Sequence, residues 1–453
     1  MTRDERIETE ITGEAAQAYA RRGACPTLAR PMRTGDGLLA RLRPQGGILT
    51  VRQCALLAHA ATRCGNGLLE ITARGSLQIR GLRSETVEPF AEAVDAAGII
   101  VSPNPVIELP PLHGEAFGDV ADAAAMELAL RDRLAEHLQA PGLAPKLSII
   151  VDGGGRFDLA DVTADIRLLA VTAGKWVVAI AGDGASARPV AAGSVDEAIA
   201  AVGELLKLLL SIGWQKRCRD ISPERLLSTF PEMHAISHHP RMGETPSVGV
   251  NAVEDGMAVI GLKLRFGQIQ AADLLAFLIF LGDLDVGDIR PAPGRCLFVT
   301  GLSEEDAVTV LQSAQRFGLS ANRDDLSSRI ATCAGAGACA SSFYATKALA
   351  GALIEGCPEI LDGSLDVHLS GCTKGCAHPR RAFTVAGAEN GYNLVLDGLA
   401  SDAPDAQIAG SDINSAIERL SRLIKNERQA GGSARACLDR VGTATITRAL
   451  RQE

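Results

Sequence analysis

The sequence predicts an α+β protein built by internal duplication. Segments in which apolar and polar residues alternate, as in strands, are mixed along the 453 residues with segments that have the pattern of helices. One strand–helix–strand module occurs twice at a constant offset along the chain, and a second module of strands joined by tight turns also occurs twice. Because strand and helix segments are intermixed, we predict an α+β architecture.

The first module begins at Gly37. Its first copy contains a strand, a helix, a turn and a second strand, at Gly37–Arg43, Val51–Thr62, 65–67 and Leu68–Ile79. Its second copy repeats the same order at Met257–Phe266, Ala271–Leu281, Gly282–Gly287 and Asp288–Thr300. A constant offset across four elements argues against coincidence, so we expect the two copies to fold alike.

The second module differs between its copies in one important way. The first copy is predicted to contain strands Leu147–Val151, Ile166–Val171 and Trp176–Ile180, and the second copy strands Leu365–Leu369, Phe383–Gly387 and Tyr392–Leu396. After its first strand, the first copy has the Gly-rich segment 152–155, where the second copy has Cys372–Cys376. This is what we expect of a duplicated scaffold that holds a single active centre.

Helices and linkers are expected between these modules. The predicted helices are Ala121–Gln139, Val195–Ile212, Glu304–Phe317 and Ile413–Gln429. Linkers are predicted at the Pro-rich segment Ser102–Pro111 and around His234–Pro246.

Composition indicates an ordinary globular protein. Hydrophobic residues make up 47% of the chain and aromatic residues 4%, and the longest apolar runs, such as Leu274–Leu281, are too short to span a bilayer. The net charge of −9 argues against nucleic acid as the main partner. Met1–Glu14 is charged and has no apolar signal region, so we expect a cytoplasmic protein with reduced thiols.

Four of the eleven cysteines form a motif of two close pairs, Cys333-x5-Cys339 and Cys372-x3-Cys376, which are well separated along the chain. Two close pairs on separate loops can converge on one metal centre, and the residues at 334–338 are all Ala or Gly, which suits a loop wrapped around a bulky cluster. We therefore predict a [4Fe–4S] site, with a helix at Ser341–Leu353 pointing its N-terminus at the thiolates. Zinc, which favours C-x2-4-C pairs, and disulfides remain alternatives. The other seven cysteines are expected to be small buried hydrophobic residues.

Basic residues are concentrated near the N-terminus. Between Arg21 and Arg83 there are eleven arginines, no lysine and only two acids, a local balance of +9. Arginine binds carboxylates in bidentate fashion, so we favour a pocket for a small polyanion, with Arg41 and Arg43 on alternating positions of one strand. The alternative is a solvated basic face; nucleic acid is disfavoured because no aromatic residues are interleaved.

The cysteine spacing, with a duplicated half-domain ahead of each copy of the second module, resembles the nitrite and sulfite reductase family, whose members bind a [4Fe–4S] cluster next to sirohaem. The resemblance covers about Arg21 to Leu438. It implies a duplicated fold with two ferredoxin-like half-domains and two mixed α/β catalytic-type domains. The implied boundaries are 20–90 and 240–310 for the half-domains, 95–230 for a first reductase-type domain without cluster ligands, and 320–445 for the cluster domain.

The resemblance also implies roles for individual residues. By matching position, Cys333, Cys339, Cys372 and Cys376 would ligate the cluster, with Cys376 at the position that bridges cluster and macrocycle iron in the reductases. Arg74 and Gln78 lie in a segment that matches the tetrapyrrole-binding strand, and Arg41 and Arg43 match the arginine strand that reaches the macrocycle and its distal ligand. The residues expected to serve the reaction or hold the macrocycle and cluster are therefore Arg41, Arg43, Arg74, Gln78, Arg80, Lys146 and Lys374. Lys374 would supply charge to the cluster sulfurs or face solvent.

Departures from the reductases indicate one branch of the family. Lys146 stands alone where sulfite reductases have a K-x-K pair, an arginine expected near 102–105 is absent, and Cys372–Cys376 reads C-T-K-G-C rather than C-P-N-G-C. The opening at 21–39 and the segment 372–379 are similar to the precorrin-3B synthase family. That similarity implies O2-dependent hydroxylation of precorrin-3A at C20 with γ-lactone formation, in aerobic cobalamin biosynthesis. It also implies an external NAD(P)H-linked electron donor protein and a mononuclear non-haem iron beside the cluster.

Three questions stay open at this point. The iron ligands cannot be assigned; His238, His239 and His378 are the candidates considered, although packing beside the cluster is an equal role for His378. The macrocycle cleft is expected to hold the substrate itself, whereas a sirohaem-dependent sulfite or nitrite reductase is the alternative enzyme. A non-catalytic iron–sulfur or zinc protein is the alternative outside enzymes, but it leaves the concentrated arginines unexplained.

Overall fold

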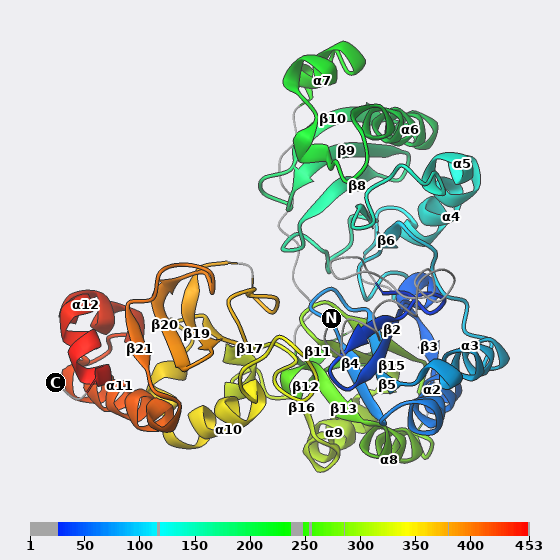
Figure 1. The fold of residues 1–453 in the computed structure, drawn as a ribbon. Coiled ribbons are helices and arrows are strands. Elements are labelled where there is room, and N and C mark those ends of the chain that lie inside the picture. Colours follow the sequence, from blue (N-terminus) through cyan, green and yellow to red (C-terminus); the bar gives the residue numbers. More distant parts are fainter. Residues whose placement is uncertain are drawn as a thin grey trace, which may run out of the picture. The chain divides into compact units, whose positions relative to one another are not determined.

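The computed structural model describes residues 26–115, 118–236, 248–252, 256–284, 286–378 and 380–451. Within these residues the chain forms two compact units, one containing 26–32 and 39–321, and the other 33–38 and 322–451. None of the helices in the described part of the chain is long and apolar enough to cross a membrane. Figure 1 shows that both units combine sheets with covering helices.

The two copies of the first module form two sheets of the same design. The first sheet has the order β1-β2-β5-β4-β13, from strands β1 (Met32–Thr34), β2 (Gly37–Leu42), β4 (Leu68–Ile71), β5 (Leu77–Leu82) and β13 (Gln268–Gln270). The second has the order β11-β12-β15-β14-β3, from β3 (Leu49–Thr50), β11 (Gly249–Ala252), β12 (Met257–Leu264), β14 (Asp288–Ala292) and β15 (Cys296–Ser303), and β16 (Leu319–Ser320) pairs with β12. The elements recur at the predicted constant offset, so the predicted duplication is present in the fold.

Each copy gives one short strand to the sheet of the other copy. Strand β3 of the first copy pairs with β14, placing Leu49 opposite Ile289, and β13 of the second copy pairs with β4, placing Ile269 opposite Leu69. The two pairings are equivalent, because the offset that relates the copies also relates these residues. Since each sheet is completed by its partner's strand, the two half-domains depend on each other for backbone hydrogen bonds.

Helices with apolar faces cover these sheets. Helix α2 (Val51–Cys64) starts at a capping box in which Thr50 and Gln53 bond each other's backbone N–H groups, and it buries a face that includes Leu57 and Ala61. It packs against its counterpart α8 (Ala271–Leu281). The other helices of the module are α3 (Val87–Ala96) and α9 (Glu304–Ser313).

The two copies of the second module also share one topology. The first has the sheet order β6-β7-β8-β9-β10, from Val106–Glu108, Ser148–Asp152, Ala164–Thr172, Lys175–Gly182 and Arg188–Gly193. The second has the order β17-β18-β19-β20-β21, from Ile330–Thr332, Val367–Ser370, Ala382–Ala388, Gly391–Gly398 and Ala406–Ile408. In both copies the first three strands are parallel and the last two antiparallel. Because the two sheets have the same strand order and directions, loops that follow equivalent strands lie at the same edge of each sheet.

Helices complete both copies. The first has α4 (Ala123–Arg133), α5 (Ala135–Leu138), α6 (Val195–Ile212) and α7 (Pro223–Thr229), and the second has α10 (Thr346–Gly356), α11 (Ile413–Glu427) and α12 (Ala434–Arg451). In the first copy, a continuous apolar core packs α4 and α6 against the sheet around Trp176. Helix α6 has the predicted bounds because Ser194 and Glu197 form a capping box at its start.

Several predicted elements differ from the structure. The second strand predicted in each half-domain, at 68–79 and 288–300, is a hairpin of two antiparallel strands, β4 with β5 and β14 with β15, because the chain turns at Gly75 and Gly294, which have positive φ. The single helix expected at 121–139 is two helices, because Leu134 departs from helical backbone angles. The expected linker at 102–111 contains strand β6, which lies at the edge of its sheet, where the prolines after it are tolerated. The other expected linker lies largely at 237–247, outside the described residues, as do Cys25 and the start of the 21–39 segment.

Candidate functional site

The four motif cysteines lie on two loops at one edge of a sheet. Cys333 directly follows β17 and begins the loop that leads to α10, and the segment Cys372–Cys376 follows β18. Strands β17 and β18 are parallel neighbours, so their carboxyl ends meet at the same edge. The fold therefore brings together two cysteine pairs that are distant in sequence.

Hydrogen bonds join the two cysteine loops directly. The Gly371 N–H donates to Cys333 Sγ over 3.1 Å, and the Phe343 N–H donates to the Gly371 carbonyl over 2.8 Å. The Lys374 ammonium donates to the Ser341 hydroxyl over 3.0 Å. A backbone N–H on a cysteine sulfur is the kind of contact that stabilises a thiolate in an iron–sulfur centre.

The sulfurs also interact electrostatically. The pKa of the Cys376 thiol is raised, first by burial and then by the charges of Cys372, Cys333 and Cys339, while Lys374 acts in the opposite direction. The other three cysteines therefore lie close enough to Cys376 to act on its pKa. Cys376 is exposed, whereas the other three are partly buried.

The four cysteines provide a donor set whose chemistry can be compared with the metal groups that thiolates hold. Among the described residues, no three His, Cys, Asp or Glu side chains are grouped closely enough to hold one metal ion. A zinc ion gathers its sulfurs at about 2.3 Å from one point, whereas a cube of iron and sulfide holds four thiolates further apart. The donor set, four cysteines with backbone N–H support, is the one that [4Fe–4S] clusters use.

Small residues allow the two loops to approach each other. Gly335 has φ +81°, and a Cβ there would lie 2.9 Å from the Thr346 hydroxyl. A Cβ on Gly371 would lie 1.9 Å from the Ser342 hydroxyl oxygen. Any larger side chain at Gly371 would therefore separate the loops and the sulfurs that they carry.

The helix expected at 341–353 begins later than predicted. The Ser342 N–H bonds to the Cys339 carbonyl over 3.0 Å and its hydroxyl to the Tyr344 carbonyl over 2.9 Å, so this segment closes the cysteine loop instead of starting the helix. Helix α10 begins at Thr346, whose hydroxyl donates to the Cys333 carbonyl over 2.9 Å. The start of the helix is thus fixed to the first cysteine.

Of the histidines considered as iron ligands, only His378 lies among the described residues. Its ring lies 5.7 Å from that of the fully buried His368, and its Nε2 lies 3.9 Å from a carboxylate oxygen of Asp366. These contacts describe packing beside the cysteine loop. His238 and His239 lie outside the described residues.

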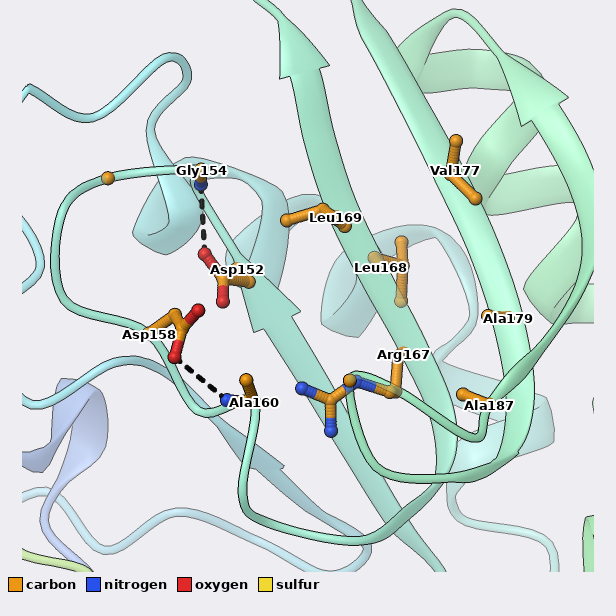
Figure 2. A pocket seen from close by; sticks show the side chains of 12 residues that line it. Asp152, Gly154, Asp158, Ala160, Arg167, Leu168, Leu169, Val177, Ala179 and Ala187 are labelled. Atoms are coloured by element: carbon orange, nitrogen blue, oxygen red, sulfur yellow. Dashed lines mark hydrogen bonds between the residues drawn. The ribbon is translucent and has the colours of Figure 1, made fainter. Parts of the chain in front are cut away.

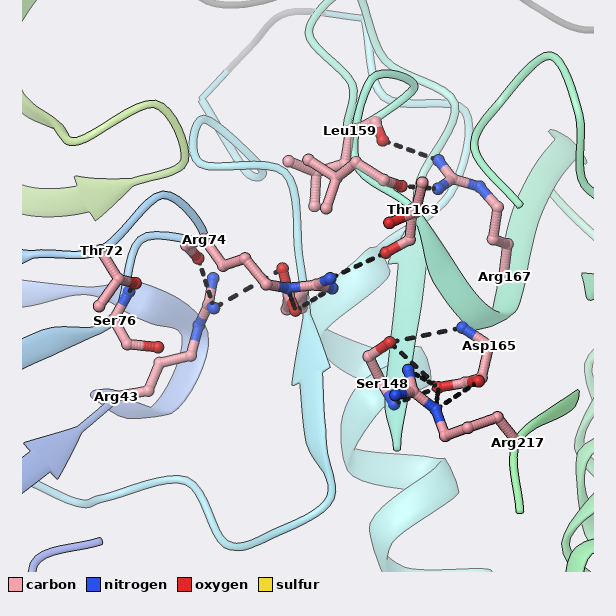
Figure 3. A network of polar contacts seen from close by, with 12 residues as sticks. Arg43, Thr72, Arg74, Ser76, Ser148, Leu159, Thr163, Asp165, Arg167 and Arg217 are labelled. Atoms are coloured by element: carbon pink, nitrogen blue, oxygen red, sulfur yellow. Dashed lines mark hydrogen bonds and ion pairs between the residues drawn. The ribbon is translucent and has the colours of Figure 1, made fainter. Parts of the chain in front are cut away.

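The predicted arginines of the other unit form networks with carboxylates (Figure 3). Arg74 donates to one oxygen of Glu108 from Nε over 2.8 Å and from Nη2 over 2.5 Å, and to the Thr163 carbonyl over 2.9 Å. Arg43 lies 3.8 Å from the second oxygen of Glu108 and donates to the Arg74 carbonyl over 2.9 Å. Burial, and secondarily the charge of Arg74, lowers the pKa of Arg43, while Glu108 opposes this shift.

A second network lies on β4 and β5. Arg80 is buried and pairs with Glu70 over 3.2 Å. With the Gln78 amide oriented to satisfy both its groups, its oxygen accepts from Arg41 Nε over 3.0 Å and its nitrogen donates to Glu70 over 2.9 Å. Lys146 lies elsewhere, exposed in the turn before β7.

Sequence reasoning missed the acidic partners of these arginines. Glu108 falls in the segment expected to be a linker, yet it is 2% exposed and lies between two guanidinium groups. Three of the predicted site arginines pair with Glu108 or Glu70. The Arg74 side chain is 39% exposed, compared with 8% for Arg43 and 3% for Arg80. Arg74 is therefore the most accessible to solvent of these three arginines.

Sequence reasoning also missed a small pocket in the first copy of the second module (Figure 2). It is lined by Asp152, Asp158 and Arg167 together with glycines of the 152–155 segment. Burial raises the pKa of Asp152 to about 6, and the charge of Asp158 acts in the same direction, while the Gly154 N–H and Arg167 oppose it. One segment of this pocket, 153–158, follows β7 as the segment with Cys372 and Cys376 follows β18.

Comparison with known proteins places the chain among tetrapyrrole-related oxidoreductases. The model of the nitrite/sulfite reductase ferredoxin-like half domain matches residues 30–97. A precorrin-3B synthase of a Sinorhizobium species is 41% identical over 98% of this chain and 97% of its own length. A ferredoxin–nitrite reductase of Synechococcus elongatus is 23% identical over 78% of this chain and 76% of its own length. The solved structure of the Mycobacterium tuberculosis NirA protein has a TM-score of 0.67 at 17% identity, covering 90% of this chain and 84% of that one, and it supports the duplicated reductase fold.

Proposed function

Since the chain belongs to the precorrin-3B synthase family, within the nitrite and sulfite reductases, we propose that it converts precorrin-3A into precorrin-3B. The reaction inserts one atom of O2 at C20 of the macrocycle, with γ-lactone formation. The second oxygen atom leaves as water, and this takes two electrons and two protons from an external NAD(P)H-linked donor protein. The proposal assigns the chain to aerobic cobalamin biosynthesis.

The observation that carries this proposal is the meeting of the four cysteines. Cys333, Cys339, Cys372 and Cys376 would hold a [4Fe–4S] cluster, which supplies electrons one at a time when it is bound. The Gly371 N–H on Cys333 Sγ would offset negative charge on that sulfur. Lys374, held by Ser341, would add a positive charge close to Cys372 and Cys376.

Substrate binding is assigned to the arginines of the half-domains. Precorrin-3A carries many carboxylates, and the planar fork of arginine binds carboxylates in bidentate fashion. Arg74 is the primary candidate because its side chain is partly exposed and is held in one orientation by Glu108 and the Thr163 carbonyl. Arg41 and Gln78 would add further polar contacts, while Arg43 and Arg80 are buried and would support the shape of this region.

The test begins with protein purified without air. Iron, sulfide and macrocycle content are measured, and the protein is then incubated with precorrin-3A, a reductant system and isotopically labelled O2. We expect four sulfide and at least four iron per chain, no tightly bound sirohaem, and one labelled oxygen atom in the product. Tightly bound sirohaem with sulfite or nitrite turnover would instead identify a reductase. Cluster-free protein would contradict the proposal.

A further inference from the structure

The tip of an N-terminal hairpin lies against the first cysteine loop. Strands β1 and β2 are joined at Gly35 and Asp36, and residues 33–38 belong to the same compact unit as 322–451. The Thr34 hydroxyl lies 2.8 Å from a carboxylate oxygen of Asp36 and 2.9 Å from the Gly37 carbonyl, which closes the tip from inside. A segment far upstream in the sequence therefore takes part in the cysteine unit.

The contact is made by backbone atoms on both sides. The Gly35 N–H donates to the Ala338 carbonyl over 3.2 Å. A Cβ at Gly35 would lie 3.0 Å from Cys339 N, 3.0 Å from the Gly337 carbonyl oxygen and 3.1 Å from the Ala338 carbonyl carbon. Backbone atoms cannot rotate aside as the end of a flexible side chain does, so a methyl group here requires the loop to move.

This contact fixes the peptide that leads into Cys339. The carbonyl of that peptide, from Ala338, accepts from Gly35, and its N–H, from Cys339, donates to the Gly335 carbonyl over 2.9 Å. Both polar groups of one planar unit are thus bonded, and the plane cannot rotate without breaking one bond. The direction of the Cys339 side chain depends on this plane.

We propose that Gly35 is a positioning residue for Cys339, holding the first cysteine loop in the geometry that the cluster requires. The inference rests on the proposed cluster ligation. Gly35 acts through close approach, because its φ lies outside the left-handed region and alanine would bring no backbone strain there. Partners that orient metal ligands typically change metal affinity by about 10- to 100-fold when they are altered.

Gly35→Ala is the direct test, and Gly410→Ala is its matched control. Gly410 lies in the same unit, with no positive φ and no atom within 4 Å of an added Cβ. Both variants and the wild type are purified without air, and iron and sulfide content, the electron paramagnetic resonance spectrum after reduction, and the rate of bleaching in air are measured. We expect Gly35→Ala to bleach about tenfold faster, with an altered spectrum, and Gly410→Ala to match the wild type.

Thr34→Val provides a milder second variant if Gly35→Ala does not fold. It removes the hydroxyl that closes the tip and is expected to change the same measurements in the same direction by a smaller factor. Folded Gly35→Ala that matches a cluster-loaded wild type in all three measurements would overturn the inference alone, as would wild-type behaviour of Thr34→Val when Gly35→Ala is not folded. A wild type without iron and sulfide would overturn both this inference and the proposed function.

Discussion

In both copies of the second module, a backbone hydrogen bond joins two loops at the same edge of the sheet, and we call this contact the loop crossing. The copies differ in the side chains that surround it. In the second copy the Phe343 N–H bonds to the Gly371 carbonyl over 2.8 Å; in the first copy the N–H groups of Val120 and Ala121 bond to the Gly153 carbonyl over 2.8 and 3.0 Å. The carbonyl belongs in both cases to a glycine directly after the second parallel strand. The crossing is therefore a property of the fold, present with and without cysteines.

What the copies place around the crossing is chemically different. The second copy has four thiols. The first copy has a pocket lined by the carboxylates of Asp152 and Asp158 and the guanidinium of Arg167 (Figure 2). Arg167 also donates to the Val162 carbonyl over 2.5 Å and to the Leu159 carbonyl over 2.8 Å. The first copy thus stabilises its loops with hydrogen bonds from a buried arginine, whereas the proposed function gives the second copy a group that it must bind.

The largest expected effect separates these two modes of stabilisation. Cys372→Ala removes one of the four sulfurs, and we expect loss of most or all of the iron and sulfide because the remaining three cannot complete the cluster's ligand set. Iron and sulfide assays on protein purified without air measure the loss. Cys437→Ala, which alters a buried cysteine of the same unit, should keep the cluster; a full cluster in Cys372→Ala would contradict the assignment.

The next effect is expected in the first copy alone. Arg167→Leu removes the hydrogen bonds to the Val162 and Leu159 carbonyls and the cation that faces Asp152 and Asp158, and leaving buried polar groups unsatisfied costs about 1–3 kcal/mol. The chain's two tryptophans, Trp176 and Trp214, both lie in the first copy, so their fluorescence during urea unfolding reports on that copy. Iron content should not change, and exposed Arg188→Leu should leave the unfolding midpoint nearly unaltered.

A smaller effect concerns the substrate. Arg74→Lys keeps the charge but removes the planar guanidinium that Glu108 and the Thr163 carbonyl hold in one orientation, and we expect KM for the tetrapyrrole to rise about tenfold with kcat little changed. Steady-state kinetics measure both constants. Arg83→Lys alters an exposed arginine paired with Glu85 and should leave KM unchanged. A fall in kcat alone would point to a role in the reaction step instead of in binding.

The smallest expected effect is a pH dependence in the first copy. The pKa of Asp152 is about 6, above the ordinary 3.8, so its contribution to stability is full below about pH 4 and is lost as pH rises through 6. Asp152→Asn should therefore gain about 1 kcal/mol relative to the wild type between about pH 5 and pH 7.5, measured by tryptophan fluorescence in urea. Asp183→Asn should show no such gain, because hydrogen bonds from Ser186 lower the pKa of Asp183 and it is ionised throughout this range.

Periodicity and repetition predicted the duplication, the central strands and the main helices, but not the edge strands β6, β10, β17 and β21. The constant offset between the copies predicted that the half-domains repeat, and α6 has the predicted bounds because its capping residues are local. The start of α10 was predicted wrongly because Ser342 and Phe343 bond to groups on the cysteine loops instead of continuing a helix. Such bonds depend on loops that only the folded chain brings together.

Some features of the candidate site could also be predicted from the sequence, and others could not. The cysteine spacing indicated which residues converge, and the arginine-rich segment indicated where cations gather. The sequence did not indicate that Glu108 pairs with Arg74 and that Glu70 pairs with Arg80. Glu108 is far from Arg74 in the sequence. The sequence also gave no sign that Gly35 supports Cys339.

By itself, then, the sequence determined the duplication, the order of the main helices and central strands, and the four cysteines proposed as sulfur donors, because these follow from residue type and spacing along the chain. Only the tertiary structure decided which half-domain strand completes which sheet, which arginines remain exposed, and which backbone atoms hold the cysteine loop. Those outcomes depend on contacts between segments distant in sequence, whose energies no local pattern records.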